Sequence, residues 1–193
     1  HGLAMRYVRT GDPGSRTAVQ ILANRSAYAN NGGSQDPYSL RETTYIVEAY
    51  LNDLKLGAAP RWQMTRSVTY LIGIVDMLTG AEAHTFLNQT FFDGLLMEAL
   101  IEYYEHTGDP RIPPTVKRLL DWIMTSAWDY NRNKIVYNPN DLPGHYTTEN
   151  INLIAPAFAW YWSLTGDETY RIFGDLMFKH SLDTAIDYNG KIF

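Results

Sequence analysis

The sequence predicts an all-α protein, built as an array of antiparallel helical hairpins. Segments with the apolar periodicity of helices alternate with glycine-containing turns. A Thr-Gly-Asp motif ends one such segment at Gly108 and another at Gly166, and these two glycines lie 58 residues apart. The Asp-Tyr-Asn triplet that starts at Asp129 recurs at Asp187 with the same offset. A fixed period of this length, with helical sequence between the marks, is typical of stacked helical hairpins.

Periodicity and turn residues predict eight helices in chain order. They cover about residues 2–9, 14–29, 39–56, 61–78, 90–106, 110–127, 149–164 and 168–184. Glycine stands where a helix end needs a left-handed residue, and aspartate follows it as the N-cap of the next helix. Gly11-Asp12-Pro13 and Gly108-Asp109-Pro110 add a proline in the first turn of that helix. Each of these tight turns joins an odd-numbered helix to the following even-numbered one.

The connections from even-numbered to odd-numbered helices are longer. They cover about residues 30–38, 79–89, 128–148 and 185 onward. Antiparallel hairpins therefore place the tight turns at one end of the array, and the long connectors at the other end with the N-termini of the odd-numbered helices. Long connectors on a rigid scaffold often carry function. Within them, residues 134–137 and 191–193 have the pattern of short strands that follow an Asp-Tyr-Asn turn.

We expect the odd-numbered helices to be inner and the even-numbered helices to be outer. The segment from Ile151 to Trp160 is apolar nearly all round, and helices of this kind are buried. The helix at 110–127, in contrast, carries charged residues on one face. Pro156 is expected to kink the helix at 149–164.

Composition fits a folded globular protein and excludes several kinds of partner and site. Of the 193 residues, 45% are hydrophobic and 19% are charged, and the net charge is −5. Basic residues form neither a run nor a stripe along a helix, so we expect no nucleic-acid partner. No apolar stretch reaches the roughly 18 residues of a membrane-spanning helix. The chain has no cysteine, and its histidines lack the spacing of metal ligands, so neither a metal nor a cofactor is expected.

The helix–Thr-Gly-Asp–helix turns, the run from Gly94 to Asp109 and the run from Asn150 to Tyr170 resemble the α/α-toroid proteins. In that superfamily about six hairpins close into a ring of inner and outer helices. The resemblance covers nearly the full chain, and no signature selects one subfamily. Many members are glycoside hydrolases or polysaccharide lyases. The resemblance therefore implies a carbohydrate-active protein with a polysaccharide or oligosaccharide partner, and we expect it to be extracellular or periplasmic.

Residues 1–193 are expected to form a single toroid-like domain that is part of a longer chain. Four hairpins fill this length, and a closed ring of the toroid kind needs about half as much again. The longer protein would leave room for additional domains or for self-assembly.

In a toroid, the N-termini of the inner helices point into a funnel at the connector end. Their aligned N–H groups suit anionic or hydroxyl-rich ligands. The polar residues at these helix starts are therefore the candidate site residues. They are His1, Arg41, Glu42, Asn88, Gln89, Asp93, His145, Tyr146, Glu149 and Asn150.

The candidate catalytic residues are His145, Tyr146, Glu149 and Asp93. A lyase that acts on uronic acids needs a group that neutralises the carboxylate, a base for the C5 proton and an acid for the leaving oxygen. Asn or Arg, His and Tyr can fill these roles. A glycosidase instead needs two carboxylates about 5–9.5 Å apart, which two of Glu42, Asp93 and Glu149 would supply if they converge.

The candidate substrate-binding residues are Arg41, Glu42, Gln89, Asn150, Trp128 and Tyr137. Aromatic residues make up 13% of the chain, and most are expected to pack between helices. Trp128 adjoins a long connector that also carries Tyr137, and we expect it to be a platform on which a sugar ring stacks.

Several of these residues have a purely structural interpretation as well. Residues 39–42 form a capping box in which Glu42 reaches back to the N–H of Ser39, and Asp93 has the same spacing from Thr90. Glu149 fits the first turn of its helix. The main alternative function is therefore a non-catalytic glycan-binding or structural module on the same scaffold. A weaker one is a repeat protein that binds peptides on its concave face.

Overall fold

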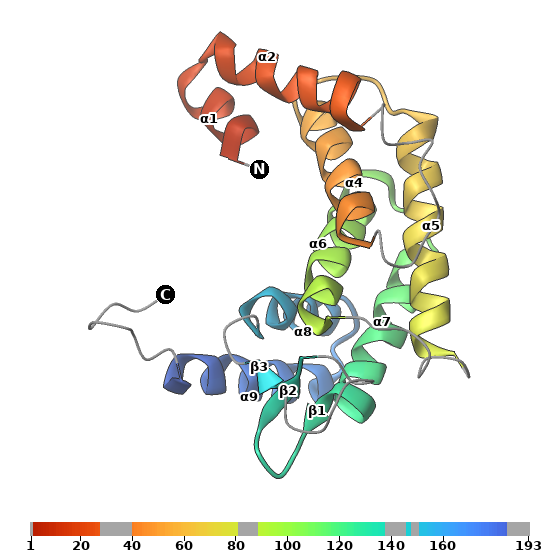
Figure 1. Ribbon diagram of the computed structural model, residues 1–193, viewed down its shortest axis with the longest axis vertical. Coiled ribbons are helices and arrows are strands. Elements are labelled where there is room, and N and C mark those ends of the chain that lie inside the picture. Colours follow the sequence, from red (N-terminus) through yellow and green to blue (C-terminus); the bar gives the residue numbers. More distant parts are fainter. Residues whose placement is uncertain (1, 28–39, 81–88, 138–145, 148–150, 185–193) are drawn as a thin grey trace. The chain divides into compact units, whose positions relative to one another are not determined.

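The computed structural model describes residues 2–27, 40–80, 89–137, 146–147 and 151–184 (Figure 1). The chain divides into two compact units, His1–Ile74 and Val75–Phe193, and we describe each by itself. The described residues are mostly helical, with one small sheet, and this confirms the predicted all-α class. No helix among them is both long and apolar enough to cross a membrane.

The first unit begins with a short hairpin that packs on a longer helix. Its elements are α1 (Gly2–Thr10), α2 (Pro13–Ile21), the π-helix η1 (Leu22–Ala27), α4 (Leu40–Lys55) and most of α5 (Trp62–Thr79). α4 contacts α1, α2 and η1. The core of the unit includes Ala4, Val19, Ala23, Val47, Tyr50, Leu51 and Val68.

A buried ion pair fixes the polar end of this first core. Asp53 is almost fully buried and forms a salt bridge with Arg61. Arg61 also donates a hydrogen bond to Asn24 Oδ1 at 2.7 Å, and its guanidinium carbon lies 5.5 Å from the centroid of the Tyr50 ring. The charge of Asp53 is therefore compensated inside the unit, as a buried carboxylate requires.

The second unit consists of two hairpins and the sheet between them in the chain. Its elements are α6 (Thr90–Thr107), α7 (Ile112–Trp122), the π-helix η4 (Ile123–Ala127), β1 (Trp128–Asp129), β2 (Lys134–Val136), β3 (Tyr146–Thr147), α8 (Ile151–Thr165) and α9 (Glu168–Thr184). α8 packs against α6, α7 and α9 (Figure 1). Both strand pairs are antiparallel, and β2 is central.

α6 and α8 approach each other so closely that their contact requires a glycine. A Cβ atom added at Gly94 would lie 2.6 Å from the carbonyl oxygen of Leu153, which is shorter than any real contact of that kind. The core around this contact includes Leu96, Met97, Leu100, Leu119, Ile123 and Phe158, all fully buried.

The tight turns at Gly11, Gly108 and Gly166 share one conformation. Their φ angles are 69°, 67° and 72°, in the left-handed region that favours glycine. Each glycine N–H donates to a carbonyl oxygen four residues earlier at 2.7 Å, which closes the preceding helix. The turn prediction is therefore confirmed at all three positions.

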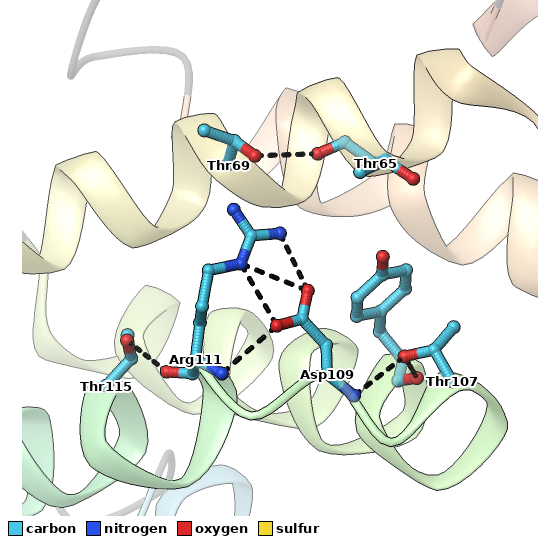
Figure 2. Close-up of polar contacts among 7 residues, drawn as sticks. Thr65, Thr69, Thr107, Asp109, Arg111 and Thr115 are labelled. Atoms are coloured by element: carbon cyan, nitrogen blue, oxygen red, sulfur yellow. Dashed lines mark hydrogen bonds and ion pairs between the residues drawn. The ribbon is translucent and has the colours of Figure 1, made fainter.

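The threonine and aspartate beside each glycine complete the turn, as Figure 2 shows for the turn from α6 to α7. Thr107 Oγ1 donates to the carbonyl oxygen of Tyr103 at 2.7 Å and accepts the N–H of Asp109 at 3.3 Å. The Asp109 carboxylate then accepts the N–H of Arg111 at 3.0 Å. The other two Thr-Gly-Asp turns repeat this pattern of bonds.

Within the long connector of the second unit, the end of β2 lies at the N-terminal end of α6. The N–H of Thr90 donates to the Tyr137 carbonyl oxygen at 3.0 Å, and Thr90 Oγ1 donates to the Val136 carbonyl oxygen at 2.7 Å. β3 pairs with β2 through Tyr146 and Val136, and α8 begins shortly after β3. The sheet therefore lies at the start of α6 and leads into the start of α8. These are the fifth and seventh of the predicted helices, so their starts share one end of this unit with the connector's described strands, as predicted.

Three features differ from the prediction. The helices predicted at 14–29 and 110–127 change to π-helix in their last turns, and α7 begins at Ile112 rather than at residue 110. β1 and β3 were not predicted, because each has only two residues. The strand expected at 191–193 lies outside the described residues.

α6 agrees with the prediction of a buried inner helix, whereas α8 agrees only in part. One side of α8 is buried, but Pro156, Ala159 and Trp162 are exposed on the other side. The described neighbours of α8 cover only one of its faces, although the helix is apolar nearly all round. α8 also continues through Pro156 without a break.

Replacing Gly108 with alanine should destabilise the protein by about 1–2 kcal/mol, because a Cβ is disfavoured in the left-handed region. Urea unfolding followed by circular dichroism measures this change. Gly73→Ala is the control, because Gly73 lies inside α5 with open space around an added Cβ, and it should not destabilise. Equal effects of the two substitutions would contradict the conformational argument.

Gly94→Ala should lower the free energy of unfolding by about 1–3 kcal/mol, because the new methyl group forces α6 and α8 apart. The same urea titration tests this, again against Gly73→Ala. If Gly94→Ala is as stable as the unsubstituted protein, the close approach of the two helices is wrong.

Candidate functional site

The main polar cluster at the connector end of the second unit consists of Asp129, Arg132 and Tyr146. Asp129 ends β1, Arg132 lies in the turn between β1 and β2, and Tyr146 begins β3. β2 separates β1 from β3 in the sheet. The Tyr146 side chain nevertheless spans β2, and its hydroxyl donates to Asp129 Oδ2 at 2.8 Å.

The Asp129 carboxylate accepts hydrogen bonds from four directions. Arg132 Nη1 donates to Oδ2 at 2.8 Å, which adds to the bond from Tyr146. The backbone N–H groups of Asn131 and Arg132 donate to Oδ1 at 2.9 Å and 3.1 Å. The guanidinium carbon of Arg132 also lies 5.4 Å from the centroid of the Tyr146 ring. Each member of the cluster therefore contacts the other two.

These bonds fix the protonation states of the cluster. The hydrogen bonds from Tyr146 and then from Arg132 lower the pKa of Asp129 to about 2. The same bond raises the pKa of the Tyr146 phenol, because only the protonated phenol can donate it. At neutral pH the carboxylate is charged and the phenol is protonated. Tyr146 is thus a proton donor held in a fixed position.

The cluster has an exposed side. The Arg132 side chain is 60% exposed, whereas that of Asp129 is only 15% exposed. Tyr130, between them in the chain, is 61% exposed, and its hydroxyl donates to the Met124 carbonyl oxygen at 3.0 Å. A cationic group therefore faces solvent beside a carboxylate of low exposure, whereas the exposed ring of Tyr130 packs on Phe173, with ring centroids 6.3 Å apart.

Trp128 is not an exposed sugar platform, and this prediction is wrong. Its side chain is 5% exposed and packs edge-on against Phe173, with ring centroids 5.4 Å apart, and against His180 at 6.3 Å. Its indole N–H is buried and finds no hydrogen-bond partner among the described residues. Successive residues of a strand face opposite sides, so Trp128 points inward where Asp129 points outward.

Asp93 does not line an open cleft, and its predicted catalytic role is not supported. Its side chain is fully buried in the first turn of α6. An acid at this position is stabilised by the positive end of the helix dipole, which accounts for its presence there.

Gln89 and Tyr137 both lie at the start of α6. Gln89 is the N-cap residue of that helix, and it makes no side-chain capping bond. Tyr137 is half-buried, and its ring centroid lies 6.0 Å from that of Phe91. These two residues stay candidates for substrate binding because they lie at the same end of the unit as the cluster.

Arg41 and Glu42 belong to the first unit and pair with each other. Arg41 Nη2 lies 2.7 Å from Glu42 Oε1, and each side chain is about half exposed. The hydrogen bond from Arg41 lowers the pKa of Glu42. The capping box predicted for Glu42 involves Ser39, which lies outside the described residues.

The remaining candidates fall outside the described parts of the chain. They are His1, Asn88, His145, Glu149 and Asn150. Within the described residues, no three acidic or histidine side chains are grouped closely enough to hold a metal ion.

A second polar cluster has a structural role. Tyr170 of α9 donates to Asp121 Oδ1 at 2.6 Å, and Lys117 of α7 donates to Asp121 Oδ2 at 2.6 Å. Burial, and then the bond to Asp121, raise the pKa of Tyr170 to about 12. These contacts join the two hairpins of the second unit.

Sequence reasoning missed Asp129 and Arg132 as site residues. The signal was present in the Asp-Tyr-Asn triplet, because an aspartate that accepts the N–H groups two and three residues later starts a tight turn. The contact to Tyr146 had no sequence signal, since it depends on the pairing of β2 with β3.

Comparisons with protein-family models, with curated proteins and with solved structures find no significant match to this chain.

Tyr146→Phe should raise the pKa of Asp129 toward the ordinary value of about 3.9, because it removes the largest stabilising bond to the carboxylate. A lowered pKa stabilises the fold above about pH 4, and this stabilisation is lost as the pH falls toward 2. The variant should therefore lose less stability over that interval. Carboxyl-carbon NMR titration measures the pKa, and thermal unfolding against pH measures the stability.

Tyr130→Phe is the matched control for this titration. The Tyr130 hydroxyl bonds to the Met124 carbonyl oxygen and not to Asp129, so its loss should leave the Asp129 pKa unchanged. An unchanged Asp129 pKa in Tyr146→Phe would show that the bond across the sheet does not form in solution.

Proposed function

We propose that this protein binds a polysaccharide through Arg132 and Tyr146, with Tyr130 of the same turn as the adjoining aromatic residue, on a scaffold of the α/α-toroid kind. One observation carries the proposal. Asp129 holds a guanidinium and a phenol in place at the connector end of the second unit, and the turn that carries Arg132 also carries the exposed ring of Tyr130.

The chemistry of these groups suits a sugar chain. Sugar hydroxyls need both donors and acceptors, and the C–H face of a pyranose packs on an aromatic ring. Arg132 uses Nη1 to bind Asp129, and its exposed guanidinium carries further N–H donors. The Tyr146 oxygen can accept a bond, and Tyr130 supplies the ring.

A uronic acid is the sugar class that fits Arg132 best. A guanidinium binds a carboxylate through two parallel hydrogen bonds, which are stronger than bonds to neutral hydroxyls. Asp129 supports this recognition indirectly, because it holds the guanidinium in place while its own oxygens are occupied by donors.

Cleavage by β-elimination is a second candidate, favoured by the protonation state of Tyr146. The leaving oxygen of the glycosidic bond needs a proton, and the Tyr146 phenol, which is protonated at neutral pH, would deliver it by turning its O–H from Asp129 to that oxygen. His145, the neighbouring residue in the sequence, would be the base. Without cleavage, the same surface would serve a glycan-binding module.

Arg132→Ala should weaken binding of a uronate-containing polysaccharide at least about tenfold, because a charged hydrogen bond is worth about 1.5–3 kcal/mol. Isothermal titration calorimetry against a panel of acidic and neutral polysaccharides measures the affinity. Arg118→Ala is the control, since Arg118 is also an exposed arginine that pairs with an aspartate, Asp76, outside the cluster. It should leave the affinity unchanged.

Two outcomes would contradict this proposal. Either no polysaccharide of the panel binds, or Arg132→Ala and Arg118→Ala weaken binding equally. The enzymatic candidate has its own readout, the appearance of unsaturated product and new reducing ends. Tyr146→Phe should abolish product formation while the polysaccharide still binds, and equal product from both proteins would exclude Tyr146 as the acid.

A further inference from the structure

The α8–α9 hairpin carries an open apolar groove with a volume of about 570 Å³, which we call the α8–α9 groove. Pro156, Ala159 and Trp162 line it from α8, and Gly174 and Phe178 line it from α9. Phe178 is 52% exposed and Trp162 is 36% exposed. Large apolar side chains are thus left open to solvent side by side on two neighbouring helices, which marks a site of interaction.

The repeat shows which surface of the α6–α7 hairpin corresponds to this groove. The 58-residue offset matches α6 with α8, and most core positions keep their burial. Each of these three pairs is buried in both helices: Leu96 and Ile154, Leu100 and Phe158, Tyr103 and Tyr161. The outer helices match in the same way. Thr115 and Phe173, and Leu119 and Met177, are buried pairs of α7 and α9.

Among the described residues, the pairs that change from buried to exposed both belong to the groove. Gly94 is buried on α6, and its counterpart Asn152 is exposed on α8. Leu120 is fully buried on α7, and its counterpart is the half-exposed Phe178. Asn152 and Phe178 both line the groove. The α8–α9 hairpin is therefore exposed at positions where the α6–α7 hairpin is buried by a neighbouring helix.

On the α6–α7 hairpin, the neighbouring helix that buries this surface is α8. The backbone of α8 at Leu153 lies against Gly94, and the ring of Trp160 meets that of Tyr104 edge-on, with centroids 5.6 Å apart. The counterparts of Gly94 and Tyr104 on α8 are Asn152 and Trp162. The α8–α9 groove is thus the repeat equivalent of the surface that receives α8.

We propose that a further helical hairpin of the same repeat, in the same polypeptide, packs into the α8–α9 groove as α8–α9 packs on α6–α7. The occupant is a helix that is apolar on at least one face, like α8. The apolar character of α8 on all sides supports this, because such helices are buried on all sides in folded proteins. The sequence supports the same polypeptide as the source, since the connector sequence that leads to α8 recurs after α9 at Asp187.

The groove is preformed for such a helix. Ser181 Oγ donates to Asn152 Oδ1 at 2.6 Å, which holds the Asn152 side chain against α9. The Trp162 indole N–H donates to Glu168 at 3.1 Å, and Arg171 pairs with both Glu168 and Asp175. The polar groups at the rim thus have their own partners, and the apolar floor is left for the incoming helix.

Thiol labelling tests the proposal directly, because the chain has no cysteine of its own. Ala159→Cys and Phe178→Cys place single thiols in the groove of the complete polypeptide. Ile172→Cys is the control, because Ile172 is 60% exposed on α9 and does not line the groove. Both groove thiols should react with a maleimide at least about tenfold more slowly than the control, at every protein concentration.

Two results would overturn the proposal. Labelling of both groove thiols at the rate of the Ile172→Cys control would show that the groove is open in the complete polypeptide. Protection that disappears on dilution would show that a second copy of the protein covers it. Circular dichroism of each variant, and equal labelling of all three thiols in guanidinium chloride, establish that differences in rate come from the folded structure.

Discussion

The second unit depends on the close contact between α6 and α8. Gly94 allows the two backbones to meet, and the hydrogen bonds of Thr90 fix the end of β2 to the start of α6. The connector between α7 and α8 is thereby held at the end of β2. The three-stranded sheet and the cluster around Asp129 are built on this connector, so the candidate site depends on the way the two hairpins pack.

Within the cluster, stability and function are divided between neighbouring side chains. Asp129 is the structural member, because its carboxylate accepts bonds from β3 and from its own turn and has little exposure. Arg132 is the exposed member and has the chemistry to meet a ligand. An anion of low exposure that holds an exposed cation in place gives a binding surface with less entropy to lose when a ligand binds.

The repeat links the candidate site with the α8–α9 groove. Each hairpin presents a connector at one end and a helix-binding surface on its side. A further hairpin would therefore bring a second connector of this kind and would bury the α8–α9 groove. The Asp-Tyr-Asn triplet that places Asp129 in the first repeat recurs at Asp187. Arrays of this kind gain stability from each neighbour, since every interface buries a face that one hairpin cannot bury alone.

The sequence by itself determined the helices, their tight turns and the strand at β2. These follow from local chemistry: apolar periodicity, the freedom of glycine at Gly11, Gly108 and Gly166 to be left-handed, and the capping of the next helix. Only the tertiary structure decided that Trp128 is buried, that Asp129 meets Tyr146 across β2, and that one face of α8 is left open. Such features depend on where other elements lie, and no local preference of the chain carries that information.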